Sequence, residues 1–319
     1  MTDPWLSILM PTYNGQAHLA DALDSVLRQG DEGIECIVVD DGSTDATLSI
    51  LDSYKAKLRM RILAAPRSGN WAANTNMALS AAGGSFVSIL HQDDMWMEGR
   101  LRAIKKLTEQ FPEINIFISP SRYVNMKGER VGLLRCPLPA LPVMIDADTM
   151  IERLLIQNFI SIPAPVFRRE TALSCGGLDG GFWYASDWDL WLKMAALGRI
   201  GYYPAPLSEF RVHPYSLTVT RSDDIEEFRR ELETVLERHL KAWKVTGRVK
   251  DPVVRAARFS IEMNVFLASL FHGKKGSLFK LLSSFIGMPL DWHRYLRDSR
   301  LTERLFGRVR GAMEKAYEV

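Results

Sequence analysis

The chain has 319 residues, of which 47% are hydrophobic and 24% charged, and its 40 Lys and Arg residues nearly balance its 38 Asp and Glu residues. This composition is that of a soluble globular protein with one large domain, or a main domain and a smaller one, and it excludes a disordered chain and a collagen-like fibre. The net charge of +2 gives no general attraction to nucleic acid, so we expect no nucleic-acid partner.

The cysteines and the apolar segments bear on location. Cys36, Cys136 and Cys175 form no CxxC pair, which predicts neither a disulfide framework nor a cysteine-based zinc site and favours a cytoplasmic protein. The first apolar run, of about six residues, is shorter than the core of a signal peptide. No apolar stretch reaches the roughly 18 residues that a bilayer span needs. We therefore expect no integral membrane protein, and peripheral attachment stays open.

The first ninety residues alternate between short β-rich runs and amphipathic helical stretches. Strands are predicted over 6–10, 34–39, 60–63 and 86–90, and helices over 18–28, 44–58 and 71–82. In the first helix Leu19, Leu23 and Val26 recur at the spacing of one helical face. Strands separated by such helices predict βαβ units, and strands that are apolar throughout are typical of a parallel sheet covered on both faces.

The rest of the chain first mixes both kinds of element and then becomes helical. Predicted here are a helix over 98–110, a strand over 114–119, a hairpin around 125–129 and helices over 148–157 and 190–197. From about residue 221, amphipathic helices follow without strands, and residues 221–319 hold 20 Lys and Arg against 14 Asp and Glu. We predict an α/β domain over 1–220, with a Rossmann-like, mostly parallel sheet flanked by helices, and a helical subdomain over 221–319.

Polar residues gather where three of the predicted strands end. Residues 11–15 (PTYNG) follow the first strand, residues 40–45 (DDGSTD) end the second, and residues 91–94 (HQDD) follow the fourth. In open α/β sheets, ligands bind in the crevice beyond the carboxyl ends of the strands. The three clusters therefore predict a single site.

Asp40 and Asp41 end the second strand. An ordinary strand–turn–helix junction would account for Gly42, which permits a sharp turn, and for Ser43 or Thr44 as a helix cap. It does not account for two adjacent carboxylates, which repel each other unless something binds between or beside them. We interpret the pair as part of a binding site.

Asp93 and Asp94 follow His91 and Gln92 at the end of the fourth strand. Carboxylates in this position are typical ligands of Mg²⁺ or Mn²⁺, which prefer oxygen ligands and are often shared with substrate phosphates. The alternative is a solvated acidic turn before the next helix, whose N-terminus also favours acids.

Asp187 and Asp189 stand beside two tryptophans just before the predicted helix over 190–197. A carboxylate near an aromatic surface can serve as a general base, because loss of solvent raises its pKa. The alternative is that one of the two acids caps the helix.

Arg211 and His213 alternate on an extended segment, so their side chains should face the same side. Both could meet phosphate oxygens or a metal ion, although a lone histidine is often structural. The histidines at positions 18, 239, 272 and 293 show no comparable pattern.

Taken together, these segments resemble the inverting glycosyltransferases of family 2, which have the GT-A fold. The resemblance covers about residues 4–216. It rests on six segments in the right order: SILMPTYNG, VVDDGSTD, GNWAANTNMAL, LHQDDMW, the GGLD…SDWDLWLK block and FRVHPYS. Each segment is weak alone, whereas the ordered set is specific.

The resemblance implies roles for individual residues. It implies that the nucleotide or the rest of the donor is bound by Pro11, Thr12, Tyr13, Asp40, Asp41, Asn70, Asn74, Gln92 and Arg211. Asp41 would read a base N–H, which suits UDP. Asp93, Asp94 and His213 would bind Mg²⁺ or Mn²⁺, and Asp187 would be the catalytic base. Two positions depart from the family pattern, because His91 replaces the first acid of the D-x-D motif and Ser186 replaces a Glu.

The function implied is transfer of a sugar from a nucleotide-diphosphate donor, with a UDP-sugar favoured. The acceptor is a hydroxyl of a glycan or a lipid-linked molecule, in cell-surface polysaccharide synthesis. A divalent cation would stabilise the departing diphosphate. Asp187 would deprotonate the acceptor on the opposite face of the sugar, which inverts the anomeric centre without a covalent intermediate.

Two other functions stay open at this stage. A nucleotidyltransferase also uses a doubly wound sheet and Mg²⁺-binding acids, but residues 11–18 contain one Gly and no Lys or Arg, unlike a basic phosphate loop. A non-catalytic nucleotide-sugar-binding protein of the same fold is compatible with the substitutions at His91 and Ser186.

The helical tail also allows two interpretations. Apolar faces occur over 261–271 and 278–286, and a basic run follows at Arg294, Arg297, Arg300, Arg304, Arg308 and Arg310. The tail either packs on the catalytic domain with a solvated charged face, or it places an amphipathic helix pair on an anionic membrane.

Overall fold

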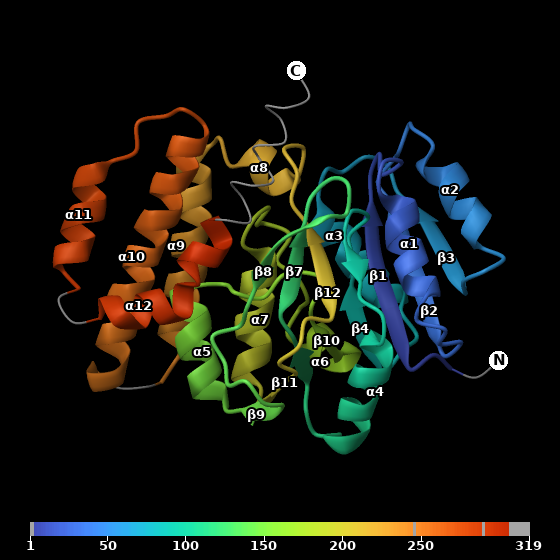
Figure 1. Cartoon of the computed structure of the whole chain (residues 1–319), viewed down its shortest axis with the longest axis horizontal. Helices are drawn as coiled ribbons and strands as arrows, with labels where there is room; N and C mark the ends of the chain where they lie inside the picture. The colour runs from blue at the N-terminus through green and yellow to red at the C-terminus, as the bar shows by residue number, and fades with distance from the viewer. Residues whose placement is uncertain (1–2, 245–246, 289–290, 306–319) are drawn as a thin grey trace.

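A computed structural model of the protein describes residues 3–244, 247–288 and 291–305 (Figure 1). Arg308 and Arg310 of the basic run lie outside these residues. Nearly all of the predicted catalytic region is therefore described, together with most of the helical tail.

The centre of the fold is an eight-stranded sheet with the order β3-β2-β1-β4-β10-β6-β11-β9. Its parallel part consists of β1 (Leu6–Thr12), β2 (Ile34–Asp40), β3 (Met60–Ala64) and β4 (Phe86–Ile89). Every residue of β1 and β2 is buried, as expected for strands covered on both faces. Because β1 lies between β2 and β4, the strand order reverses there, and this is where α/β sheets form a binding crevice.

The other half of the large sheet is mixed. It consists of β6 (Ile116–Ile118), β9 (Val143–Ile145), β10 (Val166–Arg168) and β11 (Ile200–Tyr202). Strand β10 runs antiparallel to both β4 and β6, β11 is parallel to β6, and β9 is an antiparallel edge strand.

A second sheet of four strands brings distant segments together, in the order β5-β12-β7-β8. Its strands are β5 (Met95–Trp96), β7 (Ser121–Val124), β8 (Arg130–Leu134) and β12 (Ser208–Arg211). Strands β7 and β8 form the predicted hairpin. Strand β5 pairs antiparallel with β12, with Met95 opposite Glu209. The residues just before β5 therefore lie beside the residues that end β12.

Helices cover both faces of the large sheet (Figure 1). One face is covered by α1 (Leu19–Leu27), α2 (Thr47–Tyr54) and α4 (Arg100–Gln110), and the other by α3 (Trp71–Ala81), α5 (Ala147–Ile156), α6 (Arg169–Ser174) and α7 (Ser186–Ala196). Side chains of β1 alternate between these layers, since Ile8 and Met10 pack with the first group and Leu9 with the second.

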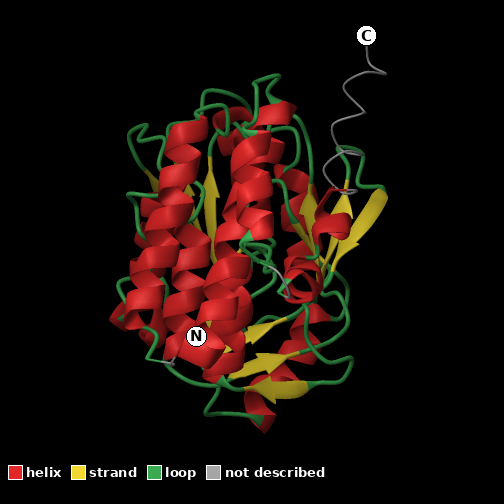
Figure 2. Ribbon diagram, turned by 90° about the vertical axis from the view of Figure 1, so that its left-hand side faces the viewer, coloured by secondary structure: helices red, strands yellow, loops and turns green. Residues whose placement is uncertain are grey.

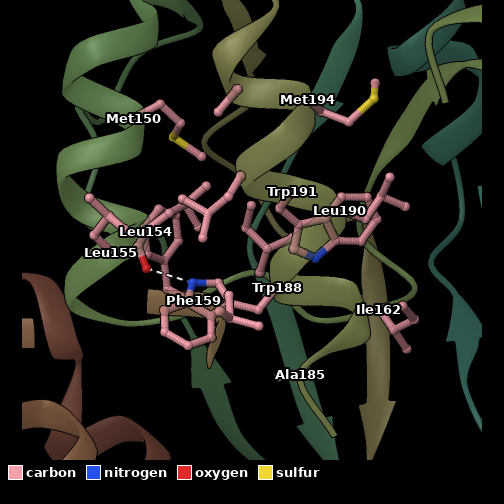
Figure 3. Close-up of a cluster of buried hydrophobic side chains, with 14 of the residues drawn as sticks. Met150, Leu154, Leu155, Phe159, Ile162, Ala185, Trp188, Leu190, Trp191 and Met194 are labelled. Atoms are coloured by element: carbon pink, nitrogen blue, oxygen red, sulfur yellow. Dashed lines mark hydrogen bonds between the residues drawn. The ribbon is translucent and has the colours of Figure 1, made fainter. Parts of the chain in front are cut away.

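Helix α7 is held in place by large buried side chains. Trp191 is fully buried, and the Trp188 indole Nε1 donates to the Leu154 carbonyl of α5 at 2.7 Å (Figure 3). The contacts in Figure 3 join α5 and α7 along one apolar seam. Close packing of this kind leaves α7 little freedom to shift.

The tail consists of helices in the part of it that the structure describes. These are α8 (Leu217–Arg221), α9 (Ile225–Ala242), α10 (Gly247–Phe271), α11 (Leu278–Ile286) and α12 (Trp292–Ser299). Viewed from the tail side in Figure 2, helices stand in front of the strands. Phe228, Val253 and Tyr295 share one hydrophobic cluster with Leu9 and Ile37 of the central strands. The core thus continues past residue 220, and the division of the chain at that point remains a prediction.

No helix in the described ranges has both the length and the apolar character that a bilayer crossing requires.

The predicted α/β class, with a mostly parallel sheet flanked by helices and a helical C-terminal part, is confirmed. The helix caps expected at Ser43 or Thr44 for α2 and at Asp187 or Asp189 for α7 are not found. Helix α2 has Ala46 as its N-cap instead of Ser43 or Thr44, because the Ser43 side chain is bonded to Asp40. Helix α7 begins four residues earlier than expected, at Ser186.

The N-cap of α7 is Ala185, without a side-chain cap, so capping by Asp187 or Asp189 is also wrong. Both acids lie inside the first turn, where the helix dipole favours negative charge. Neither acid is therefore explained as a cap.

Candidate active site

A cavity of about 550 Å³ opens where the ends of β1, β4 and β12 meet α7 and the C-terminal helices. The predicted site residues in its wall are Pro11, Thr12, Tyr13, Asp41, Asn74, Gln92, Asp93, Asp94, Asp187, Arg211 and His213. Asp40 and Asn70, which are also predicted site residues, are not part of the wall. Sheet topology explains the convergence, since β1, β2 and β4 are parallel neighbours whose carboxyl ends share one edge.

Asp41 is the most fully hydrogen-bonded acid of the cavity. Its carboxylate accepts from the Ser68 backbone N–H at 2.7 Å, from the Ser68 hydroxyl at 2.9 Å and from the Gly69 N–H at 2.9 Å, and it also pairs with the Arg67 guanidinium. Burial alone would raise the pKa of Asp41, but these hydrogen bonds, with one from Asn74, outweigh it and lower the pKa. Asp41 is therefore a permanently ionised acceptor.

Asp40 supports this turn from behind. It is buried and accepts from the Ser43 backbone N–H at 3.0 Å and from the Ser43 hydroxyl at 2.5 Å. Gly42 lies between Asp41 and Ser43 in this turn and has a φ of +75°, which favours glycine. The structure thus assigns Asp40 to the shape of the loop rather than to the cavity wall.

Tyr13 forms an aromatic platform at the same end of the cavity. The Arg67 guanidinium lies 3.6 Å from the centre of its ring, a cation–π contact. The Gln92 amide holds the Tyr13 backbone from the other side, accepting from its N–H at 2.8 Å and donating to its carbonyl at 2.9 Å. Gln92 therefore positions the first loop and links it to the segment after β4.

Asn70 and Trp71 join the start of α3 to the loop that precedes α7. Asn70 caps α3 by accepting from the Ala73 N–H at 3.0 Å, and its amide donates to the Gly180 carbonyl at 2.9 Å. The Trp71 indole donates to the Trp183 carbonyl at 2.8 Å. These contacts make Asn70 a support of the site instead of a part of its wall.

His91, Asp93 and Asp94 form a cluster that fits a divalent cation. One ligand atom of each lies within 4.8 Å of the others. Within the described part of the chain, two of the polar atoms in this cluster, His91 Nε2 and Asp94 Oδ2, are buried without a hydrogen-bond partner. Buried polar atoms are rarely left unpaired, so these two atoms, in a cluster of close ligand groups, suit a bound ion. Oxygen and imidazole ligands together suit Mn²⁺ or Mg²⁺.

His213 and Arg211 support the same cluster from β12. His213 Nε2 lies 3.1 Å from Asp93 Oδ2, whereas the Arg211 backbone N–H donates to Asp94 at 3.0 Å. Burial by itself would raise the pKa of Asp93, and the hydrogen bond from His213 together with the nearby imidazoles lowers it. Burial and the charge of Asp93 raise the pKa of Asp94 well above its ordinary value.

The Arg211 side chain is turned into the protein. Its guanidinium donates to the Asp93, Asn125 and Met126 carbonyls at 2.9, 3.0 and 2.7 Å and pairs with Asp21 at 2.9 Å. It is only 1% exposed. Donor binding by Arg211 remains a prediction, and the geometry shows a clamp on the backbone of the acidic cluster.

Asp187 lies at the other end of the cavity, in the first turn of α7. Its carboxylate accepts from the Asn158 amide at 3.1 Å and from the Trp188 N–H at 2.7 Å. Burial raises the pKa of Asp187 to about 7, and these hydrogen bonds only partly oppose the effect. A carboxylate with this pKa can accept a proton near neutral pH.

Asp189, two residues away, has the opposite environment. It is fully buried and pairs with Lys193 at 2.6 Å, and with Arg238 and His239 at 2.9 Å each. Burial opposes ionisation of Asp189, but hydrogen bonds from His239 and Lys193 and the charge of Lys193 outweigh it and lower the pKa to about 2. The structure therefore gives the two neighbouring acids opposite pKa shifts, and Asp189 belongs to a buried ion-pair network.

Several contributors were not identified from the sequence. Arg67, Asn158 and His239 stand outside every motif, and each is brought to its acid from a segment far away in the chain. His91 departs from the D-x-D pattern in the sequence, whereas in the structure its imidazole lies close enough to Asp93 and Asp94 to share a metal ion with them. Only the position of His91, directly after a strand, could have indicated its role.

The sequence comparisons agree with this geometry. Residues 7–161 match the family described as Glycosyl transferase family 2. This segment, just under half of the chain, is therefore similar to the family 2 glycosyltransferases. The matched segment includes the ends of β1, β2 and β4 and stops before Asp187 and the tail.

Relatives share this domain at moderate identity. An uncharacterised protein of Mycobacterium tuberculosis is 27% identical over 227 residues, which cover 70% of this chain and 63% of that protein. The match thus spans less than two thirds of that relative. An uncharacterised glycosyltransferase of Rickettsia typhi is 26% identical over 242 residues, 70% of this chain and 69% of its own. Glycosyltransferase GlyG of Streptococcus pneumoniae is 32% identical over 121 residues, 38% of this chain and 39% of its own.

Solved structures extend the likeness to nearly the whole chain. The structure of S. aureus TarS 1–349 in complex with UDP-GlcNAc has a TM-score of 0.61 at 18% identity and covers 91% of both chains. The mannosyltransferase PcManGT from Pyrobaculum calidifontis, in complex with GDP-Man and Mn²⁺, has a TM-score of 0.59 at 17% identity and covers 98% of this chain and 88% of its own. These likenesses confirm the predicted GT-A fold of the glycosyltransferase domain.

Proposed function

We propose that this protein is an inverting glycosyltransferase that uses a nucleotide-diphosphate sugar, with a UDP-sugar favoured, and transfers the sugar to a hydroxyl group. One observation carries the proposal. An ionised carboxylate at the end of β2, a cation-binding cluster after β4 and a carboxylate with a pKa near 7 open onto one cavity. These are the parts that binding a nucleotide diphosphate and activating a hydroxyl require.

The donor would lie over the ends of β1 and β2. Tyr13 offers a ring face for stacking a base, and Asp41 offers ionised oxygens for a base N–H, as uracil has. The Arg67 guanidinium occupies both the ring face and a carboxylate oxygen. Donor binding would therefore displace Arg67, and its charge would then be close to the phosphates. The complexes of TarS with UDP-GlcNAc and of PcManGT with GDP-Man support a nucleotide sugar as the ligand.

The diphosphate would lie next to His91, Asp93 and Asp94. These residues would hold Mg²⁺ or Mn²⁺, with His213 beside them. When bound there, the ion supplies positive charge that stabilises the departing diphosphate. Arg211 and His213 keep Asp93 in place by holding its carbonyl and its carboxylate.

Asp187 would act as the base. It would accept the proton of the acceptor hydroxyl while that oxygen attacks the anomeric carbon and the carbon–oxygen bond to the diphosphate breaks. A displacement from the face opposite the leaving group inverts the anomeric centre and needs no covalent intermediate. Asn158 and the Trp188 N–H each donate to one of the two carboxylate oxygens and so fix the orientation of the base.

The decisive experiment is a panel of sugar nucleotides. We expect one of UDP-GlcNAc, UDP-glucose and GDP-mannose to raise the Tm in the presence of Mn²⁺, and the same compound to release free nucleoside diphosphate, slowly to water and faster with an acceptor. Stabilisation without release, for every donor and with glycan and lipid-linked acceptors supplied, would instead favour the non-catalytic binding protein. Release of inorganic pyrophosphate would favour the nucleotidyltransferase.

We further propose that the acceptor is lipid-linked or a cell-envelope glycan, and that the protein lies in the cytoplasm at the inner face of the membrane, with the tail in peripheral contact. The supporting observation is α11, in which none of the nine residues is buried. Phe279 and Ile286 are 82% and 76% exposed. Lys274, Lys275 and Lys280 are exposed beside them, which suits anionic lipid.

Co-sedimentation with vesicles tests this contact. We expect binding to phosphatidylcholine vesicles that contain phosphatidylglycerol, and loss of binding in the double variant Phe279→Ser, Ile286→Ser. The matched control is Leu141→Ser, an exposed leucine before β9 that is 70% exposed. Equal binding of all three proteins, or a concentration-dependent dimer that the double variant abolishes, would contradict the lipid contact.

A further inference from the structure

Glu231 of α9 binds the segment that leads into α7. Its carboxylate accepts hydrogen bonds from three consecutive backbone N–H groups, those of Trp183 at 2.8 Å, Tyr184 at 2.9 Å and Ala185 at 3.1 Å. Ala185 is the N-cap of α7, and Asp187 lies two residues further on. A single side chain of the tail thus sets the backbone path immediately before the proposed base.

The position of Glu231 is unusual for a carboxylate. It is only 6% exposed, and it lies on the face of α9 that otherwise buries Phe228, Leu232 and Val235. An apolar residue of similar size would fill this space without the desolvation that a buried carboxylate incurs. What the carboxylate adds is a fixed geometry, because three converging N–H donors allow it only a narrow range of positions.

Helix α9 also holds the other side of Asp187. Asp189, two residues after the base, pairs with Arg238 and His239, which both lie about two turns beyond Glu231 on the same helix. Figure 1 shows α9 beside α7, and the two helices are in contact. The first turn of α7 is therefore fastened to the tail both before and after Asp187.

A carbonyl group of the same segment is bound from the other side, by a side chain at the start of α3. Trp183 accepts from the Trp71 indole, and the Trp71 ring packs edge-on against His91 at a centroid distance of 5.2 Å. The segment 183–185 is thus held between α9 and the residues next to the acidic cluster. Its position decides how far the Asp187 carboxylate stands from that cluster.

We propose that Glu231 is a positioning residue that holds Asp187 in the orientation required for proton transfer, so that the helical tail is part of the catalytic machinery. The inference rests on the proposed role of Asp187 as base. Because Glu231 does not line the cavity, it would act only through the backbone of 183–185. A displacement of about 1 Å at a reacting group can lower a rate about 100-fold.

The test compares Glu231→Gln with Glu237→Gln, an exposed glutamate on the same helix. The amide keeps the size of Glu231 but places an NH₂ group against N–H donors. We expect Glu231→Gln to lower kcat for UDP release from the UDP-sugar with Mn²⁺ about 10- to 100-fold, with KM for the donor and Kd for UDP unchanged. Rates are normalised to the fraction of protein that binds UDP, so that misfolded protein does not contribute.

The pH profile separates positioning from a merely structural role. Asp187 contacts Asn158, Trp188 and Trp191 and no charged group in the described ranges, so its pKa depends on how well it is buried. If the segment loosens in Glu231→Gln, solvent reaches Asp187 and the acid limb of kcat moves to lower pH. The residues of the acidic cluster are the same in both variants, and the Glu237→Gln control should keep the parent profile.

Glu231→Asp is the second variant, since it keeps the charge but retracts it by one methylene and should fall between Glu231→Gln and the parent. A loss of Tm with kcat and the acid limb both unchanged would overturn the inference. Full activity of Asp187→Asn would overturn the proposed base instead, and this outcome is distinguishable because it does not involve Glu231.

Discussion

At the β2 end of the cavity, Asp41 accepts hydrogen bonds from Ser68 and Gly69 and pairs with Arg67, whereas at the α7 end Asp187 accepts from the neutral donors of Asn158 and Trp188. The first environment lowers the pKa of the carboxyl group, and the second raises it to about 7. Burial raises the pKa of both groups, and only at Asp41 do the surrounding donors outweigh it. One end holds a carboxylate that stays ionised, and the other holds one whose pKa of about 7 allows it to exchange a proton near neutral pH.

The largest effect is expected at the α7 end. Asp187→Asn keeps the shape of the side chain and removes the base, so kcat for UDP release should fall about 1000-fold, within the range of general-base contributions. Kd for UDP, measured by calorimetry, should not change. A variant that retains more than a tenth of the parent kcat would contradict this comparison, because the reaction would then not need Asp187 as a proton acceptor.

The acidic cluster between the two ends should come next. Asp93→Asn is expected to weaken Mn²⁺ binding 10- to 100-fold and to lower kcat at subsaturating Mn²⁺ to a similar extent, since a carboxylate ligand and the partner of His213 are lost. The matched control is Glu98→Gln, an exposed acid a few residues away. Equal Mn²⁺ affinity in Asp93→Asn, measured by calorimetry, would place the ion elsewhere.

The pH dependence should reveal the raised pKa directly. Because only the deprotonated base accepts a proton, kcat should fall about tenfold per pH unit below about pH 7. The free energy of unfolding should change with pH in the opposite direction to kcat. The folded state binds more protons than the unfolded state between the ordinary pKa of 3.8 and about 7, so the Asp187 contribution to stability falls as the pH rises through this window.

Asp187→Asn removes the titrating carboxyl group and therefore the loss of stability that accompanies its ionisation at higher pH. We expect the variant to have a higher Tm than the parent above pH 7 and a similar Tm near pH 4, measured by calorimetry over the pH range. A parent and variant with identical pH dependence of Tm would show that Asp187 has an ordinary pKa.

The smallest effect is expected at the β2 end. Asp41→Asn should raise KM for the UDP-sugar about tenfold, as expected for loss of a hydrogen bond to a charged group, and leave kcat within twofold. Its pH profile should keep the acid limb near pH 7, because the group that titrates there is Asp187. A change in kcat with an unchanged KM would reverse the assignment of the two ends.

Much of the fold could be predicted because its signals are local. The apolar runs of β1 and β2 and the helical spacing of Leu19, Leu23 and Val26 specify βαβ units wherever they occur. The polar clusters after β1, β2 and β4 could likewise be assigned to one edge, because parallel neighbouring strands end together.

The start of α7 and the environment of Asp187 could not be predicted in this way. Its early start at Ser186 depends on Glu231 and His239, which lie 45 and 53 residues further along the chain than that serine and carry no local signal. The same holds for Arg67, which reaches Asp41 only after the chain has passed through α2 and β3.

The sequence by itself determined the alternation of strands and helices and the presence of acids at strand ends, since these depend on periodicity and on neighbouring residues. Only the tertiary structure decided what each acid can do. Asp187 and Asp189 are the same residue type two positions apart, but burial raises the pKa of Asp187 to about 7, whereas His239 and Lys193 outweigh burial at Asp189 and lower its pKa to about 2. Burial and charge pairing are properties of the assembled core, so no local pattern could separate them.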